Sequence, residues 1–90
     1  MYFVYVLQSK TDNRWYTGST PHLAKRYQEH KQGKVLSTKN RLPVQLIYYE
    51  AGRNYSDARN RERYLKSGAG KRFLRNRLKH FLATLTGAPL

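Results

Sequence analysis

Five polar side chains stand out because their chemical types complement one another, although they lie far apart in the chain. They are two phenols, a guanidinium, an imidazole and a carboxylate: Tyr5, Tyr16, Arg26, His30 and Glu62. A guanidinium offers a planar donor fork to a phosphate group. Phenols and imidazoles can position or deprotonate a water molecule. Brought together, these groups would supply the activated water and the charge stabilisation that phosphodiester hydrolysis requires.

Glu62 occupies an unusual place in a predicted helix. The apolar face of that helix carries Tyr55, Ala58, Leu65 and Ala69, and Glu62 lies in the middle of it. A carboxylate among core-facing positions is costly unless it is paired or binds a cation. A hard divalent ion accepts as little as one carboxylate when water and phosphate oxygens complete its octahedron. Glu62 is therefore the predicted ligand of a metal ion such as Mg²⁺.

Each of the five side chains also has a purely structural explanation. Tyr5 and Tyr16 can be core tyrosines with satisfied hydroxyl groups. Arg26 can be solvated, and His30 can simply complement the dipole at a helix end. Glu62 can pair with a basic side chain, for which the candidates are Arg26, Arg61 and Lys66. The residue types alone leave both explanations open at every position.

The composition narrows the range of partners. Eighteen lysines and arginines face five acidic residues, which gives the 90-residue chain a net charge of +13. So basic a domain attracts polyanions, and nucleic acid is the first candidate, ahead of an anionic membrane surface or a ribosome. The lack of cysteine excludes disulfides, thiolate metal sites and a cysteine nucleophile. No export signal or membrane-spanning segment is expected at the apolar N-terminus, so the cytoplasm is the expected compartment.

The predicted elements follow the order β-β-α-β-α-α. A continuous apolar run predicts a strand buried on both faces, and hence central, over residues 2–7. Further strands are predicted over 14–17, where Gly18 ends the strand, and over 45–50. Capping residues and apolar spacing predict helices over 21–32 with Gly33 as C-cap, over 54–66 capped by Asn54 or Ser56, and over 71–85. This order indicates class α+β, a small antiparallel sheet packed by helices.

The first predicted helix places two of the five polar side chains next to each other. Its apolar stripe consists of Leu23, Ala24 and Tyr27, and both Arg26 and His30 fall at the edge of that stripe. Side chains at such an edge are expected to be half-buried, at the wall of a cleft.

The same residues resemble the motifs of the GIY-YIG nuclease family, in particular its short stand-alone bacterial members. Phe3-Val4-Tyr5 stands where that family has Gly-Ile-Tyr, and Tyr16-Thr17-Gly18 stands where it has Tyr-Ile-Gly. Arg26 and His30 match the family's first helix, and the segment 58–66 resembles the one that carries a metal-binding glutamate. The resemblance covers nearly the whole chain, with a phenylalanine in place of the first glycine and a threonine in place of the second isoleucine.

The resemblance implies a GIY-YIG-like fold: a small three-stranded antiparallel sheet flanked by three helices. It implies a single domain over residues 1–85 and a C-terminal tail over 86–90. The activity implied is that of a metal-dependent endonuclease, with Mg²⁺ or Mn²⁺ as the ion.

The roles implied for the site residues follow the family. Tyr5 or Tyr16 would act as the general base or assist it, and His30 could share that role. Arg26 would stabilise the charge on the phosphoryl oxygens, and Glu62 would hold the metal ion near the leaving 3′ oxygen.

The partner implied is nucleic acid, with DNA favoured over RNA and no obligate protein partner. Contacts to the sugar–phosphate backbone position a strand but read no bases, so little sequence specificity is expected. The expected contact residues are Lys34, Lys39, Arg41, Lys71, Arg72, Arg75 and Asn76. A non-catalytic nucleic-acid-binding module on the same scaffold is the alternative.

Overall fold

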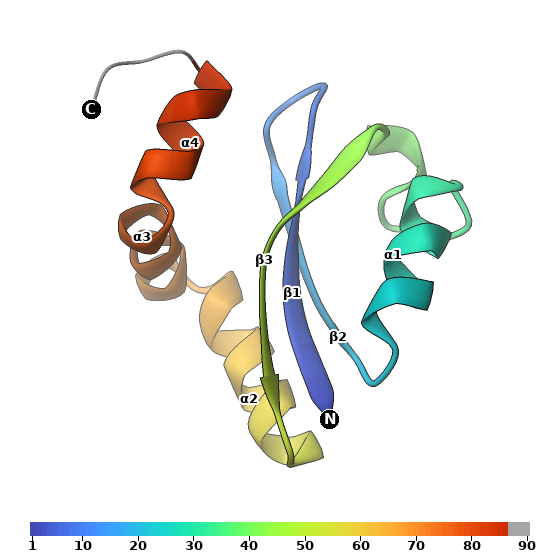
Figure 1. Ribbon diagram of the computed structural model, residues 1–90, viewed down its shortest axis with the longest axis vertical. Helices are drawn as coiled ribbons and strands as arrows, with labels where there is room; N and C mark the ends of the chain where they lie inside the picture. Colours follow the sequence, from blue (N-terminus) through green and yellow to red (C-terminus); the bar gives the residue numbers. More distant parts are fainter. Residues whose placement is uncertain (87–90) are drawn as a thin grey trace.

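Figure 1 shows the computed structural model of the chain, which describes residues 1–86. Within that range the predicted α+β class is confirmed, with three strands, four helices and one short 3-10 helix. Their bounds are β1 (Tyr2–Ser9), β2 (Trp15–Thr20), α1 (Leu23–Lys31), η1 (Lys39–Arg41), β3 (Val44–Gly52), α2 (Tyr55–Lys66), α3 (Gly68–Arg77) and α4 (Lys79–Thr86). The expected tail lies, from residue 87 on, outside the described residues.

The sheet is antiparallel with the strand order β2-β1-β3, so the predicted central position of β1 is confirmed. Its centre is marked by Tyr5, which pairs with Gly18 on β2 and with Tyr49 on β3. The prediction that Gly18 ends its strand is wrong, because β2 continues to Thr20. Gly18 is needed inside the strand, since a Cβ atom there would lie 2.7 Å from the hydroxyl oxygen of Tyr5.

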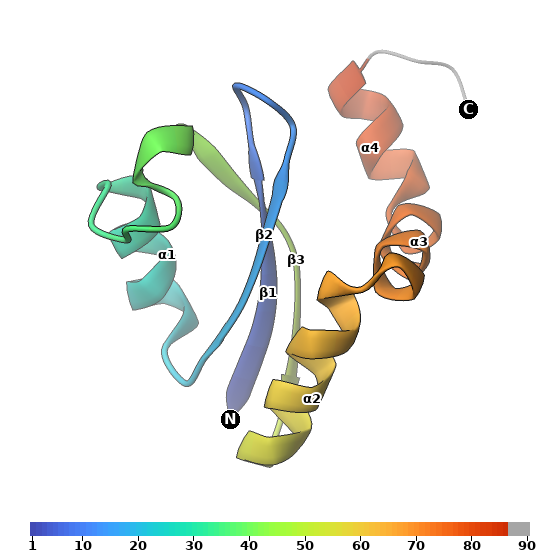
Figure 2. The same ribbon diagram turned by 180° about the vertical axis from the view of Figure 1, so that it is seen from behind.

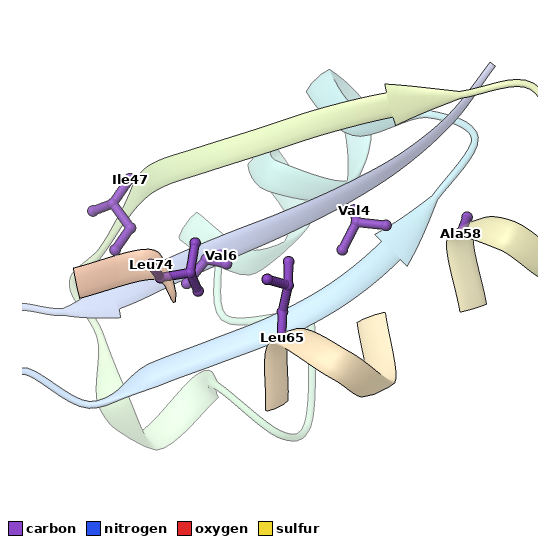
Figure 3. Packing of buried hydrophobic residues seen from close by; sticks show 6 residues of the cluster. All are labelled: Val4, Val6, Ile47, Ala58, Leu65 and Leu74. Carbon is purple, nitrogen blue, oxygen red and sulfur yellow. The ribbon is translucent and has the colours of Figure 1, made fainter. Parts of the chain in front are cut away.

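The helices cover both faces of the sheet. In Figures 1 and 2, α1 lies on one face, while α2, α3 and α4 lie on the opposite side. Because side chains alternate along a strand, β1 sends Val4 and Val6 to one face and Tyr5 and Leu7 to the other. The first pair belongs to a buried cluster with Ile47, Ala58, Leu65 and Leu74 (Figure 3), designated the α2–α3 cluster. The second pair packs beneath α1 together with Val44.

The first helix begins later than the sequence predicts. It starts at Leu23, and the hydroxyl of Thr20 accepts a hydrogen bond of 3.0 Å from the backbone N–H of His22. Gly33 follows the helix with a φ of +76°, in the left-handed region that suits glycine. Ala24, expected in the apolar stripe, is exposed instead.

The second helix is capped as one of the two alternatives predicts. The side chain of Asn54 accepts a hydrogen bond of 3.0 Å from the backbone N–H of Asp57. Two residues expected on its buried face are not there: Tyr55 is mostly exposed at the first turn, and Ala69 is exposed in the next helix.

The last predicted helix is in fact two helices, α3 and α4, and it begins earlier than expected. Ser67 ends α2 and caps α3, because its hydroxyl accepts a hydrogen bond of 3.1 Å from the backbone N–H of Gly70. A Cβ atom at Gly70 would overlap the backbone carbonyl of Tyr64, so glycine lets α3 start close against the end of α2. A second change of direction follows at Leu78, whose backbone leaves the helical region.

None of the helices within residues 1–86 is long and apolar enough to cross a membrane.

Candidate active site

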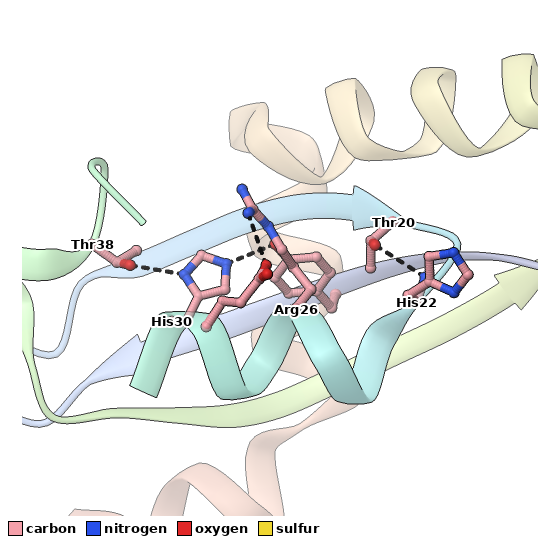
Figure 4. Close-up of polar contacts among 7 residues, drawn as sticks. Thr20, His22, Arg26, His30 and Thr38 are labelled. Atoms are coloured by element: carbon pink, nitrogen blue, oxygen red, sulfur yellow. Dashed lines mark hydrogen bonds and ion pairs between the residues drawn. The ribbon is translucent and has the colours of Figure 1, made fainter. Parts of the chain in front are cut away.

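Tyr5, His30 and Thr38 form a buried chain of hydrogen bonds beneath α1. The hydroxyl of Tyr5 lies 2.8 Å from Nε2 of His30, and Nδ1 of His30 lies 2.7 Å from the hydroxyl of Thr38. Figure 4 shows His30 with Thr38 on one side and Arg26 on the other. The expectation of a half-buried His30 is wrong, because the side chain is fully enclosed. It is enclosed by the loop that carries Thr38, which folds back over the end of α1.

Burial sets the protonation states of this chain. It lowers the pKa of His30 to about 4, and the positive charge of Arg26 lowers it further than the opposing charge of Glu29 raises it. Burial likewise raises the pKa of Tyr5 to about 12, assisted by Tyr16. At neutral pH the imidazole is therefore uncharged and the Tyr5 phenol keeps its proton.

The partners of Tyr5 assign a tautomer to His30 and a direction to each hydrogen bond. The side chain of Arg26 lies close enough to the Tyr5 oxygen to lower the pKa of that phenol. A guanidinium only donates, so the Tyr5 O–H is left to donate to Nε2 of His30. The neutral imidazole then carries its proton on Nδ1 and donates it to the hydroxyl of Thr38.

Tyr16 contributes the second phenol on the same face of the sheet. Its ring centroid lies 5.1 Å from that of His30 and 6.3 Å from that of Tyr5. Tyr16 is half-buried, whereas Tyr5 is 1% exposed. Among the described residues no hydrogen-bond partner meets the Tyr16 hydroxyl. Tyr16 is thus the phenol that water or substrate can reach.

Arg26 lies at the open side of the same group. Its guanidinium pairs with Glu29 at 3.3 Å, and both side chains are partly exposed. Ion pairs of this kind contribute little to stability. Arg26 can therefore exchange Glu29 for a phosphate group at small cost.

Glu62 approaches the group from the opposite side of the sheet. It extends from α2 to the edge strand β2, where its Oε1 accepts a hydrogen bond of 2.6 Å from the hydroxyl of Ser19. Its Oε2 accepts one of 2.8 Å from Nζ of Lys66, and Arg59 lies 3.6 Å from Oε1. Burial raises the pKa of Glu62, but these hydrogen bonds and charges outweigh it, so the pKa lies below its ordinary value.

Of the three partners that the sequence offered for Glu62, one is confirmed and two are wrong. Lys66 is a partner, but Arg61 pairs with Glu50 at 2.8 Å and Arg26 with Glu29. Glu62 still acts electrostatically on the other site residues, because its negative charge is one of the causes that raise the pKa of Tyr5. The structure thus brings four of the five predicted side chains together and places the fifth across the edge strand, beside Gly18 and Ser19.

The donor set around Glu62 restricts how a metal ion can be held. Among residues 1–86 no group of three acidic, histidine or cysteine side chains converges as a ready ligand cage. Glu62 fits a hard ion as a single carboxylate ligand, provided that the half-exposed Lys66 moves off Oε2. Water and substrate oxygens would complete the coordination, as Mg²⁺ commonly requires.

Three of the seven predicted nucleic-acid contacts meet in one cleft. Arg41, Lys71 and Arg75 line a cavity of about 710 Å³ between the β1–β2 hairpin and α3–α4. The other four residues are exposed outside this cleft: Lys34, Lys39, Arg72 and Asn76.

Sequence reasoning missed four residues that shape these sites: Ser19, Thr38, Arg14 and Trp15. Ser19 directly follows the Tyr-Thr-Gly motif, and Arg14 and Trp15 directly precede it, which is a usable signal. Thr38 gives no local signal, because only the folded loop brings it to His30.

Comparison with known proteins gives a family match and several relatives. The family profile of the GIY-YIG catalytic domain matches residues 1–79, a stretch that contains all five site residues. No solved structure matches the chain.

Several curated relatives named UPF0213 proteins are similar to this chain. One from Clostridium perfringens is 42% identical over 67 residues, covering 73% of this chain and 71% of the relative. YazA of Bacillus subtilis is 42% identical over 66 residues, covering 72% and 66%, and one from Desulfotalea psychrophila is 39% identical over 67 residues, covering 72% and 60%. The chain thus spans between three-fifths and about seven-tenths of the length of these relatives. Because the family profile covers most of its residues, the chain belongs to the GIY-YIG family, a nuclease family.

Proposed function

We propose that this protein is a divalent-metal-dependent endonuclease that hydrolyses phosphodiester bonds in nucleic acid. The observation that carries the proposal is the buried contact between Tyr5 and His30, with Tyr16 and Arg26 beside it. Glu62 accepts a hydrogen bond from Ser19 of the edge strand β2, from the opposite face of the sheet. A buried, fully hydrogen-bonded polar group of this kind is costly to build into a small core, and a catalytic role accounts for it.

The raised pKa of Tyr5 and the partial exposure of Tyr16 assign different roles to the two tyrosines. Removing the proton of Tyr5 at pH 7 costs about 7 kcal/mol against a pKa of about 12. Protonating His30 costs about 4 kcal/mol against a pKa of about 4. Both steps are expensive, so Tyr5 acts as a positioning residue that keeps its proton. Tyr16 is half-buried and its hydroxyl has no hydrogen-bond partner among the described residues, so it would contact the attacking water as general base.

The remaining side chains act on the negative charge of the phosphate and of the leaving oxygen. Arg26 leaves Glu29 and donates its planar fork to the phosphoryl oxygens, where negative charge grows in the transition state. GIY-YIG nucleases generally use divalent metals, and here Glu62 would be the residue that holds Mg²⁺ or Mn²⁺. The ion would stabilise the negative charge on the leaving 3′ oxygen.

The substrate is proposed to be DNA in preference to RNA, cut with little sequence specificity. The support is the net charge of +13 and the lysines and arginines that face outward along the described chain. Contacts of this type hold a backbone without reading bases. Consistent with such a substrate, we place the protein in the cytoplasm, as a single domain without an obligate protein partner.

Plasmid nicking tests the proposal. Wild-type protein with Mg²⁺ or Mn²⁺ should convert supercoiled plasmid to open circles, and Glu62→Gln should lose this activity. Glu50→Gln is the matched control, because Glu50 is a half-buried acid in an ion pair with Arg61, remote from Tyr16. The absence of nicking by wild type, or equal nicking by both variants, would overturn the proposal.

The closed contact between Glu62 and Lys66 favours one second candidate, a binding module without turnover. Such a module predicts salt-sensitive binding of nucleic acid that Glu62→Gln leaves unchanged or strengthens, with no metal-dependent cleavage.

A further inference from the structure

A wide cleft lies next to the candidate active site and is not explained by it. The cleft, designated the Trp15 cleft, has a volume of about 710 Å³ and is lined by Arg14, Trp15, Arg41, Lys71 and Arg75, with leucines of α4 at its rim. None of the described residues that line it is acidic. Four cations around one indole form a surface that is both positively charged and aromatic.

The Trp15 cleft lies next to the Glu62 side of the candidate active site. A second cavity of about 280 Å³ shares Trp15 and Lys71 with the cleft and is also lined by Thr17 and Lys66 on the same face of the sheet. Lys66 is the partner of Glu62, and Glu62 is hydrogen-bonded to Ser19 of β2. A chain molecule that occupies the cleft can therefore continue along the edge strand β2 toward Glu62.

The indole of Trp15 is held in a fixed orientation. Its Nε1–H donates a hydrogen bond of 2.7 Å to the side chain of Gln8, and its ring packs against the α2–α3 cluster. The ring is half-buried, so part of its surface faces the cleft. The guanidinium of Arg75 lies 5.7 Å from the ring centroid on an exposed side chain, and it can turn from the indole to a phosphate.

We propose that the Trp15 cleft binds an unpaired nucleotide, whose base stacks on Trp15 while Arg75 and Lys71 contact the adjacent phosphates. The proposal rests on the proposed nuclease function for the position of the cut, which would lie beside the cleft at the edge strand β2. Aromatic rings combined with a basic groove are the usual means of holding single-stranded nucleic acid. In an intact duplex the bases are already stacked on one another, so they cannot reach the indole. The favoured substrates are therefore nucleic acids with a single-stranded segment beside the scissile bond.

Trp15 itself supplies the readout, because it is the only tryptophan of the chain. Its fluorescence should be measured with EDTA present, so that no cleavage intervenes, during titration with a 10-mer of oligothymidylate. The two comparison probes are an abasic 10-mer, which keeps the phosphates and lacks the bases, and a blunt duplex. We expect quenching by oligothymidylate and a dissociation constant about 5- to 100-fold lower than that of the abasic strand.

Equal affinity for the two single strands, without quenching, would mean that the cleft holds phosphates only and would overturn the proposal. Quenching by the blunt duplex equal to that by oligothymidylate would also overturn it.

Charge variants locate the binding. Arg75→Gln should weaken oligothymidylate binding about 5-fold or more and lower the salt dependence by about one phosphate contact. The matched control is Arg53→Gln, an exposed arginine that directly follows β3, which should change affinity less than 2-fold. Equal effects of the two variants would show that binding depends only on the overall positive charge, and would refute binding in the Trp15 cleft. Cleavage of an end-labelled single strand with Mg²⁺ or Mn²⁺ is scored separately: absent cleavage with intact quenching rejects the nuclease function, whereas cleavage without quenching rejects the Trp15 cleft.

Discussion

Replacing Gly18 with alanine would place a Cβ atom 2.7 Å from the hydroxyl oxygen of Tyr5 and 2.8 Å from its Cζ. Both distances are far below van der Waals contact, and Tyr5 is fully packed, so the ring has to shift. Overpacking of a core costs about 1–3 kcal/mol. A shifted ring also gives up the 2.8 Å hydrogen bond to His30, and stranding such a buried polar group costs about 1–3 kcal/mol. Since one movement causes both losses, we expect Gly18→Ala to destabilise the protein by about 2–4 kcal/mol.

Urea denaturation measures this loss, and Gly52→Ala provides the matched control. Gly52 lies in the same sheet, at the end of β3, and no atom lies within 4 Å of the position its Cβ would take. Alanine there should be neutral or stabilising by about 0.5–1 kcal/mol. In a Tyr5→Phe background, where the clashing hydroxyl is absent, the cost of Gly18→Ala should fall, and a double-mutant cycle gives the coupling. If Gly18→Ala proved as stable as Gly52→Ala, the close approach of Tyr5 to β2 would be refuted.

Three further predictions concern the buried chain and the carboxylate. Thr38→Val removes the acceptor of the His30 Nδ1–H and should destabilise the protein by about 1–3 kcal/mol, while Thr38→Ser should restore most of the loss in urea denaturation. Because the folded pKa of His30, about 4, lies below its unfolded value of 6.5, the histidine contributes stability that is complete above pH 6.5 and is lost as the pH falls toward 4. This contribution amounts to at most about 3 kcal/mol, and a His30→Gln variant should lack that part of the pH dependence. Lys66→Gln frees Oε2 of Glu62 and should lower the Mn²⁺ concentration needed for half-maximal nicking, whereas Arg59→Gln, 3.6 Å from the other oxygen, should change it less; no difference between these two variants would contradict single-carboxylate binding.

The parts of the fold that the sequence predicts well are those encoded by local patterns. An uninterrupted apolar run gives β1 its central place, because only a strand covered on both faces buries every residue of such a run. The cap at Asn54 follows from its side chain and the residues just after it. Both features depend on neighbours in the chain.

The wrong boundaries come from contacts between distant residues. Gly18 carries the ordinary signal of a strand end, but its lack of a side chain accommodates Tyr5 of the neighbouring strand. Gly70 carries the signal of a helix break, but it lets α3 pack against the carbonyl of Tyr64. In both cases glycine makes room for another part of the chain, and the sequence alone does not tell this use from a turn.

In the candidate site, too, some features follow from local sequence and others from contacts between distant residues. The types and order of its residues point to one chemistry, which the family profile supports. The burial of His30 depends on Thr38, eight residues away in a loop without regular spacing, and the partner of Glu62 on β2 comes from 43 residues earlier. Periodicity describes one element at a time, so it cannot report contacts that form only when elements meet.

The alternation of β1 between two packed faces has a consequence for how the molecule comes apart. Val4 and Val6 pack in the α2–α3 cluster on one face of the sheet. Tyr5 and Leu7 alternate with them along β1 and pack beneath α1 on the other face. Neither layer can separate without disturbing the strand that the opposite layer needs, so local opening through the middle of the sheet is suppressed. Backbone amides of β1 should then exchange with deuterium only through global unfolding, at one common free energy. Truncation of Leu65, which belongs to the α2–α3 cluster and not to the cluster of Tyr5, should accelerate that exchange across the strand as a whole.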